Sequence, residues 1–177
     1  EEKEAKRIAK KIVKERKIKK IDTRILVEII EKTKKKKNFK THSATKVFQA
    51  LRIFVNKEIS ELIEGIIKAT RFVKEGGKII FISFHSIEDK IIKFYFSNYS
   101  LGKSNPSRYL PNDNDDTTIF FKNKNSFITP SSNEIKINPS SRSAKLRFAI
   151  RNEKIFKDPI ELRNKFRKYL NLEEIYV

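Results

Sequence analysis

The sequence predicts an α/β fold built around a parallel sheet. A helical pattern of apolar residues at 43–73 is followed by a β-branched and aromatic run at 78–84, and a second helical pattern begins near Ser86. The order helix, buried strand, helix is typical of α/β sheets with parallel strands. Too few further strands follow to complete a doubly wound sheet, so we expect that another part of the fold precedes this sequence.

Two helices are predicted at the N-terminal end. Residues 1–17 place apolar side chains at helical spacing among Lys, Arg and Glu, which indicates an amphipathic helix. A second helix is expected to begin near Asp22 or Thr23, whose side-chain oxygens can cap free backbone amides, and to bury Leu26, Ile29 and Ile30. The four lysines at 34–37 are typical of a loop that faces either solvent or phosphate.

The central segment predicts a long helix, a strand and a third helix start. Apolar residues recur at steps of three and four from Ser43 to about Val73, which indicates one long helix buried over much of its surface. Gly76-Gly77 ends this region, and the run at 78–84 has no polar alternation, as expected of a strand covered on both faces. Ser86 is expected to cap the next helix, with Asp89 three residues further on.

The remaining segments are less regular. Residues 97–117 are rich in Asn, Ser, Asp and Pro, which predicts a flexible excursion. Order is expected to return at 118–121 and 127–128, and 144–150 is a candidate strand. Pro159 suits the first position of a last helix. One side of that helix would carry Leu162, Phe166, Tyr169 and Leu170.

Composition narrows the functional classes. The formal charge of +19 in 177 residues attracts polyanions, which makes nucleic acid the first partner to consider, although an AT-rich genome that favours Lys would give the same charge. The absence of Cys excludes disulfides and thiolate chemistry and is consistent with the cytoplasm. No apolar stretch is long enough to cross a bilayer, and no signal peptide is recognisable. The sequence contains no Met, so we expect a fragment of a longer chain.

Chemically versatile residues gather after the predicted strand. Ser83, His85, Ser86, Glu88 and Asp89 follow one another where the strand ends, and open α/β sheets bind ligands at that edge. For the two acids, helix capping and complementing the helix dipole are equally good explanations. The only other histidine, His42, also lies where a loop meets a regular element, and either histidine alone would be only a weak candidate.

Two further groups are candidates for RNA contact. Thr45, Gln49, Arg52 and Asn56 form one polar stripe on the predicted long helix, which suits either a half-buried site or a buried hydrogen-bond network. Near the candidate strand at 144–150, the basic residues could hold RNA phosphates or form an ordinary solvated edge. These residues are Arg142, Lys145 and Arg147.

Three collinear blocks resemble the MraW family, the family named ribosomal RNA small subunit methyltransferase H. The first block runs from Thr41 through His42-Ser43-Ala44-Thr45 and Phe48-Gln49-Ala50-Leu51-Arg52-Ile53 to Asn56 and Glu58. The second runs from Gly76-Gly77 to Ile82-Ser83-Phe84-His85-Ser86-Ile87-Glu88-Asp89. The third runs from Pro130-Ser131 through Glu134 and Asn138-Pro139 to Arg142-Ser143-Ala144-Lys145-Leu146-Arg147. The sequence departs from the family pattern at Ser43, usually Pro, at Ile87, usually Leu, and at Ser140, often Arg. The last departure removes one possible phosphate contact.

The resemblance implies a fold and a cofactor. Residues 1–40 would end the helical insert domain, 41–150 would be the C-terminal part of the Rossmann-like methyltransferase domain, and 151–177 a C-terminal tail with a helix. The implied cofactor is S-adenosyl-L-methionine, but the four glycines form no G-x-G pattern, so its site is expected mainly in a missing N-terminal part and a fragment alone would be inactive.

The resemblance also implies a reaction, N4-methylation of a cytidine in the decoding region of small-subunit (16S) ribosomal RNA, with the 30S subunit as partner and no metal. It implies a catalytic set made of Ser83, His85, Ser86, Glu88 and Asp89. It implies a substrate-binding set made of His42, Gln49, Arg52, Asn56, Arg142, Lys145 and Arg147. The rival interpretations are a non-enzymatic basic RNA- or ribosome-binding protein, which the charge favours, and a structural fragment whose sheet cannot form alone.

Overall fold

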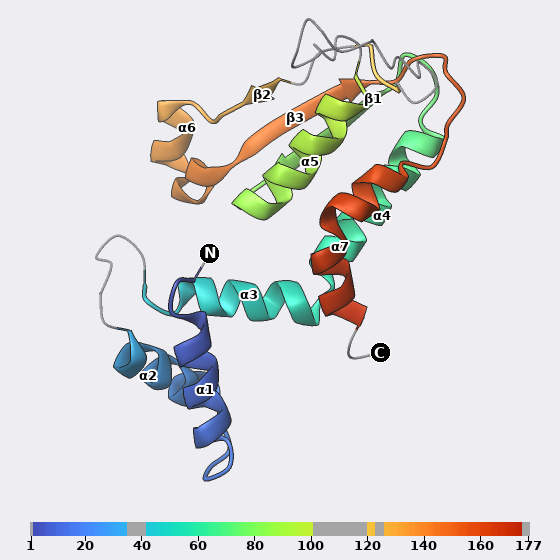
Figure 1. The fold of residues 1–177 in the computed structure, drawn as a ribbon. Helices are drawn as coiled ribbons and strands as arrows, with labels where there is room; N and C mark the ends of the chain where they lie inside the picture. Colours follow the sequence, from blue (N-terminus) through green and yellow to red (C-terminus); the bar gives the residue numbers. More distant parts are fainter. Residues whose placement is uncertain (1, 35–41, 101–119, 123–125, 175–177) are drawn as a thin grey trace, which may run out of the picture. The chain divides into compact units, whose positions relative to one another are not determined.

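The structure is a computed structural model, and it describes residues 2–34, 42–100, 120–122 and 126–174 (Figure 1). The chain forms two compact units, Glu1–Glu58 and Ile59–Val177, which we describe one at a time. The predicted excursion lies outside the described residues from position 101 onward, as does most of the predicted basic loop. The domain division expected near residues 40 and 150 stays a prediction.

The first unit contains the helices α1 (Ala5–Glu15), α2 (Thr23–Thr33) and α3 (Thr45–Val55). The first two were predicted, and so was the cap of α2, where the Asp22 carboxylate accepts a hydrogen bond from the Ile25 amide at 2.7 Å. Ile8 of α1, Ile30 of α2 and Ala44 form a small buried core. Apolar side chains packed against this core are Ile12, Leu26, Val27, Val47 and Phe48.

The single long helix predicted for residues 43–73 is wrong, because α3 ends at Val55 and α4 (Glu58–Phe72) starts afresh. Lys57, between them, has a φ of 52°, in the left-handed region that residues with side chains rarely adopt. Its amide bonds to the Phe54 carbonyl at 3.3 Å, which closes α3 in the manner of a helix C-cap. The apolar spacing continues in phase across this break, so periodicity alone cannot reveal it. Burial also differs from the prediction, since α3 has no buried residue and α4 has several.

The second unit contains a three-stranded antiparallel sheet in the order β1-β3-β2. Its strands are β1 (Lys78–Ser83), β2 (Phe127–Ile128) and β3 (Lys145–Ile150). Both strand pairs are antiparallel, with Ser83 opposite Lys145, so the predicted parallel sheet is wrong for these strands. The order of helices and strands indicates that a strand is covered, but it does not fix the direction of a neighbour 62 residues away.

Only one face of this sheet is covered within the second unit. Ile79 and Ala149 on the α5 side are buried, whereas Ile80, Ile82 and Ile128 are 57%, 56% and 57% exposed. The prediction that the strand at 78–84 is covered on both faces is therefore wrong for the described residues. Hydrophobicity does not alternate along β1, but burial does, because no layer among the described residues of this unit covers the second face.

Helix α5 (Ser86–Asn98) lies along the sheet (Figure 1), and α7 (Ile160–Glu174) packs against α5. The second unit also contains α4 from Ile59 onward, the short α6 (Ser132–Ile137) and a 3₁₀ helix (Pro139–Ser143), and the last two contact each other. Aromatic side chains from α5 and from the segment before Lys122 form much of the core, as where Phe96 meets Phe121 edge-on at 5.2 Å. None of the described helices is long and apolar enough to span a membrane.

The predicted last helix is confirmed, beginning one residue after Pro159. Leu162 and Phe166 are buried, and Phe166 meets Phe94 of α5 edge-on at 5.6 Å. Glu173, 5% exposed, accepts hydrogen bonds from the backbone amides of Ile59 at 3.2 Å and Ser60 at 2.9 Å. A carboxylate from the end of the chain thus caps the first turn of α4, where amides lack helical partners.

Candidate active site

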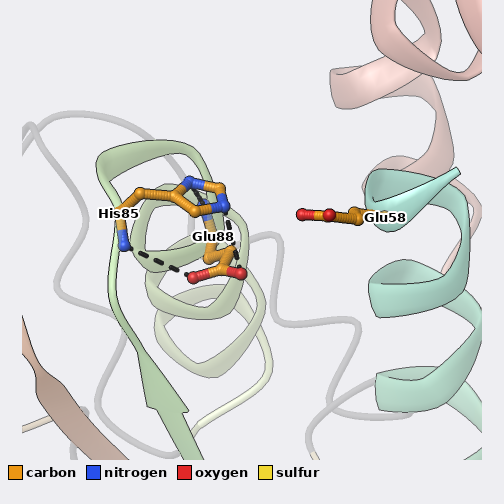
Figure 2. Close-up of side chains that lie close together, drawn as sticks. All are labelled: Glu58, His85 and Glu88. Atoms are coloured by element: carbon orange, nitrogen blue, oxygen red, sulfur yellow. Dashed lines mark hydrogen bonds and ion pairs between the residues drawn. The ribbon is translucent and has the colours of Figure 1, made fainter. Parts of the chain in front are cut away.

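The turn from β1 into α5 is held by His85 and Glu88. The Glu88 carboxylate accepts hydrogen bonds from the Phe84 amide at 3.0 Å and the His85 amide at 3.4 Å, and His85 Nδ1 accepts one from the Glu88 amide at 3.4 Å (Figure 2). Each residue therefore satisfies a backbone amide of the other, which makes a reciprocal capping box.

The cap predicted at Ser86 is wrong by one position. His85 keeps an extended backbone, with φ −135° and ψ 162°, so the helix begins after it and an imidazole nitrogen takes the role expected of a hydroxyl. Ser86 becomes the first helical residue, and its side chain is exposed. Of the five predicted catalytic residues, only Ser86 is exposed.

The tautomer of His85 follows from this cap. Because Nδ1 accepts a hydrogen bond, the neutral ring carries its proton on Nε2. Nε2 is buried and lies 3.0 Å from a Glu88 carboxylate oxygen, but the two atoms are not aligned for a hydrogen bond. Within the described part of the chain, Nε2 of His85 therefore has no hydrogen-bond partner.

Asp89 is bound by two cations of β3. Its carboxylate accepts hydrogen bonds from Arg147 Nε at 2.7 Å and Lys145 Nζ at 3.0 Å. Burial alone would raise the pKa of Asp89, but the hydrogen bonds from Arg147 and Lys145 outweigh it and hold this pKa below its usual range. Both oxygens are occupied, so the geometry of Asp89 suits holding β3 against α5 rather than accepting a proton.

The two cations differ in accessibility. Arg147 is 3% exposed, and its guanidinium lies inside the unit, where it is not presented to a solvent-side ligand. The side chain of Lys145 is 40% exposed and extends to the surface. Arg142 in the 3₁₀ helix is exposed, whereas its neighbour Ser141 is buried and donates to the Asn138 carbonyl at 2.8 Å.

Phe127 belongs to this site and was missed by the sequence reasoning. Its ring lies over Arg147, with the guanidinium carbon 4.9 Å from the centroid, and it is 53% exposed. An aromatic residue in a short strand ahead of a basic one is the only signal in the sequence that pointed to Phe127.

Ser83, which is 1% exposed, donates to the Lys145 carbonyl at 3.4 Å and so ties β1 to β3.

The other predicted substrate residues lie in the first unit. His42 Nδ1 accepts the Ala44 amide at 3.2 Å, and Nε2 lies 3.5 Å from Glu31. His42 therefore holds the turn before α3, whose N-cap residue is Ala44, and its ring faces Glu31 of α2.

The predicted polar stripe of α3 ends in a surface network. Arg52 donates two hydrogen bonds to Glu58, at 2.7 and 3.1 Å, and Asn56 donates a third at 3.3 Å. Among the described residues Arg52 and Asn56 are exposed and Gln49 is half-buried, and their part in substrate binding stays a prediction. The network fixes the chain on both sides of the left-handed Lys57.

The described glycines do not form a cofactor cradle. Gly76, with a φ of 75°, and Gly77 make the turn before β1, and a Cβ on Gly77 would lie 2.5 Å from Val73, so a side chain there would force a shift of the turn. Gly65 lies within α4. The residues that the structure describes therefore contain no glycine-rich loop that could bind the methionine end of S-adenosylmethionine.

Comparison with known proteins identifies the family of this chain. Residues 1–152 match the model of the MraW methylase family. The chain is similar to proteins named Ribosomal RNA small subunit methyltransferase H from Agrobacterium fabrum, with 44% identity over 153 residues, and Bartonella bacilliformis, with 43% over 155 residues. These alignments cover 85% and 86% of this chain, which spans 45% and 46% of the relatives' length. The chain belongs to the MraW methylase family.

Proposed function

We propose that this chain is the C-terminal part of an S-adenosylmethionine-dependent methyltransferase that modifies N4 of a cytidine in the decoding region of small-subunit ribosomal RNA. The observation that carries the proposal is the turn from β1 to α5, where residues that resemble the family's motif form the His85–Glu88 capping box and Asp89 binds Lys145 and Arg147 of β3. The names of the relatives support ribosomal RNA as the substrate and a methyltransferase as the class of enzyme.

The chemistry sets what the turn must do. The exocyclic amine of cytosine is conjugated with its ring and is a poor nucleophile, so the base must leave its stack and be held with the amine oriented. The exposed Ser86 hydroxyl can accept from the amine, and His85, whose buried Nε2 lies 3.0 Å from Glu88, orders the turn beside it. The exposed ring of Phe127, supported from behind by Arg147, is a surface on which a base can stack.

The acids then act as positioning residues. Glu88 orients His85 through the capping box, and Asp89 fixes Lys145 and Arg147 beside the turn. Arg142 and Lys145 are the accessible cations for RNA phosphates on this side of the sheet. No metal is required for such a displacement.

The cofactor would be bound by residues outside this sequence. The uncovered face of the sheet supports this part of the proposal, because Ile80, Ile82 and Ile128 form an exposed apolar patch of the kind that another layer usually covers. The other edge of β1 has no paired strand in the described residues. Since the described residues supply no cradle for the cofactor, we assign none of them a contact with it.

Calorimetry with S-adenosylmethionine tests the proposal. This chain is compared with the corresponding protein of the relatives' full length, and only the longer protein is expected to bind. Binding by this chain alone would contradict the placement of the cofactor site. If neither protein binds, the non-enzymatic RNA-binding interpretation becomes the better account.

A variant at the turn tests the assigned chemistry. His85→Ala in the full-length protein is expected to lower turnover far more than RNA affinity, since the ring orders the turn that would hold the base and is not one of the exposed cations for RNA phosphates. Lys90→Ala, on the exposed side of the same helix, is the matched control and should leave turnover unchanged. Equal turnover in the two variants would remove His85 from the site.

A further inference from the structure

A hollow in the first unit is lined by basic side chains. It has a volume of about 410 Å³, and its walls are formed by Arg7, Lys10, Lys11, Lys14, Lys32 and Thr33. The four residues from α1 follow the spacing i, i+3, i+4, i+7, which places them on one stripe of that helix. The last turn of α2 supplies the other two, and no acidic residue lines the hollow.

This stripe is unfavourable for an isolated helix. Like charges three or four positions apart repel by a few tenths of a kcal/mol for each pair. Ion pairs offset part of this repulsion, since Arg7 lies 2.7 Å from Glu4 and Lys11 lies 2.9 Å from Glu15. Lys10 and Lys14 have no ion-pair partner in the part of the chain that the structure describes.

The charge of the unit supports an anionic ligand. Residues 1–58 contain 20 Lys or Arg against 8 Asp or Glu, a surplus of 12 out of the formal +19 of the whole chain. Exposed ion pairs such as those of Arg7 and Lys11 contribute little to stability, so their cations are available to another anion at small cost. Such a concentration of charge raises the local concentration of polyanions.

We infer that this hollow binds backbone phosphates of RNA, at a contact additional to Arg142 and Lys145. The inference rests on the proposed function for the identity of the RNA, but not for the binding itself. A basic amphipathic helix can also lie on an anionic membrane, but only if its apolar side is free to insert. In α1 that side is occupied, because Ile8 is buried and Ile12 packs against the core of the unit. RNA is therefore the favoured ligand.

The test is binding of a fluorescein-labelled single-stranded RNA of mixed sequence to the whole chain, followed by anisotropy over a range of salt concentrations. In the variant Lys10→Gln/Lys14→Gln, affinity at low salt is expected to fall about tenfold, and the slope of log affinity against log salt to flatten by about one to two units. Gln has nearly the helix propensity of Lys, so the circular dichroism of α1 should not change.

The matched control is Lys6→Gln/Lys17→Gln, which removes two exposed lysines that do not line the hollow. It should leave the affinity within about twofold and the slope reduced by less than one unit. Equal losses in the two variants would mean diffuse attraction and would overturn the inference, as would no loss in either. Binding to vesicles of phosphatidylserine and phosphatidylcholine that depends on Lys10 and Lys14, with RNA affinity unchanged, would assign the hollow to membranes instead.

No methyl donor is present in this assay, so its result is independent of catalysis. Loss of RNA binding in the hollow variant together with an inactive full-length protein would keep the site and refute the proposed function. An active full-length protein together with unchanged RNA binding in that variant would keep the proposed function and refute the binding site in the hollow.

Discussion

Replacement of Asp89 by Ala tests whether the carboxylate between β3 and α5 is a structural centre of the second unit. The change removes the carboxylate that pairs at 2.7 Å with Arg147, a guanidinium that is only 3% exposed. Leaving a buried charge without its ion-pair partner typically costs about 3 to 5 kcal/mol. Since the Asp89 side chain keeps 12% exposure, we expect the lower end, a loss of about 3 kcal/mol in the free energy of unfolding.

The assay is urea unfolding followed by tyrosine fluorescence. All five tyrosines lie beyond residue 58 and the chain has no Trp, so this emission reports the second unit alone. Lys145→Ala is the matched control, because its side chain is 40% exposed and its pair with Asp89 should contribute less than about 1 kcal/mol.

A double variant separates a charge effect from a general loss of packing. Replacing both partners of a buried pair by apolar groups is often neutral, so Asp89→Ala/Arg147→Met should recover at least about half of the loss. A loss below about 1 kcal/mol in Asp89→Ala, or simple additivity in the double variant, would refute the reasoning. Because the pKa of Asp89 is lowered in the folded state, its contribution should be present at neutral pH and disappear as the pH falls below about 4.

Three further predictions concern the second unit. Burial raises the pKa of Tyr95 and raises that of Tyr99 to about 12, so the folded state disfavours their ionisation. The contribution of these two tyrosines to stability should be constant below about pH 10 and fall as the pH rises beyond it, in urea titrations at successive pH values. Glu173→Gln should lower the free energy of unfolding by about 1 kcal/mol because it weakens the cap of α4, and an unchanged urea midpoint would contradict that role. Gly77→Ala should destabilise the protein by about 1 to 3 kcal/mol because the new Cβ would clash with Val73. Gly65→Ala, at a helical position with open space, should stabilise it by up to about 1 kcal/mol. Melting-temperature shifts of the same sign in both variants would contradict the geometry.

Local signals in the sequence predicted local structure well. Asp22 was expected to cap α2 and does so, because a carboxylate before an apolar helical run has few other uses. The cap of α5 was placed one residue late, since His85 is an uncommon capping residue and its role depends on the backbone staying extended for one more position. The break at Lys57 was missed because the apolar spacing runs through it without a change of phase.

Contacts between distant residues were beyond the reach of such patterns. Asp89 is 56 residues from Lys145 and 58 from Arg147, and no local spacing indicates that they meet. The antiparallel direction of β3 and the place of Phe127 beside Arg147 could not be predicted for the same reason, because both depend on how the chain returns to β1. The carboxyl end of β1 was nevertheless chosen for the site on its residue types, and the structure brings Ser83, Asp89 and Lys145 together there.

The boundary of the family match is not the boundary of the folded unit. The match stops at residue 152, yet Leu162 and Phe166 lie in the interior and Glu173 holds the first turn of α4. A shortened protein that stops at residue 152 would expose the side of α5 where Phe94 now meets Phe166 and would leave the amides of Ile59 and Ser60 to water. Anyone who trims the chain to its recognisable homology for expression would therefore remove a stabilising part of the second unit.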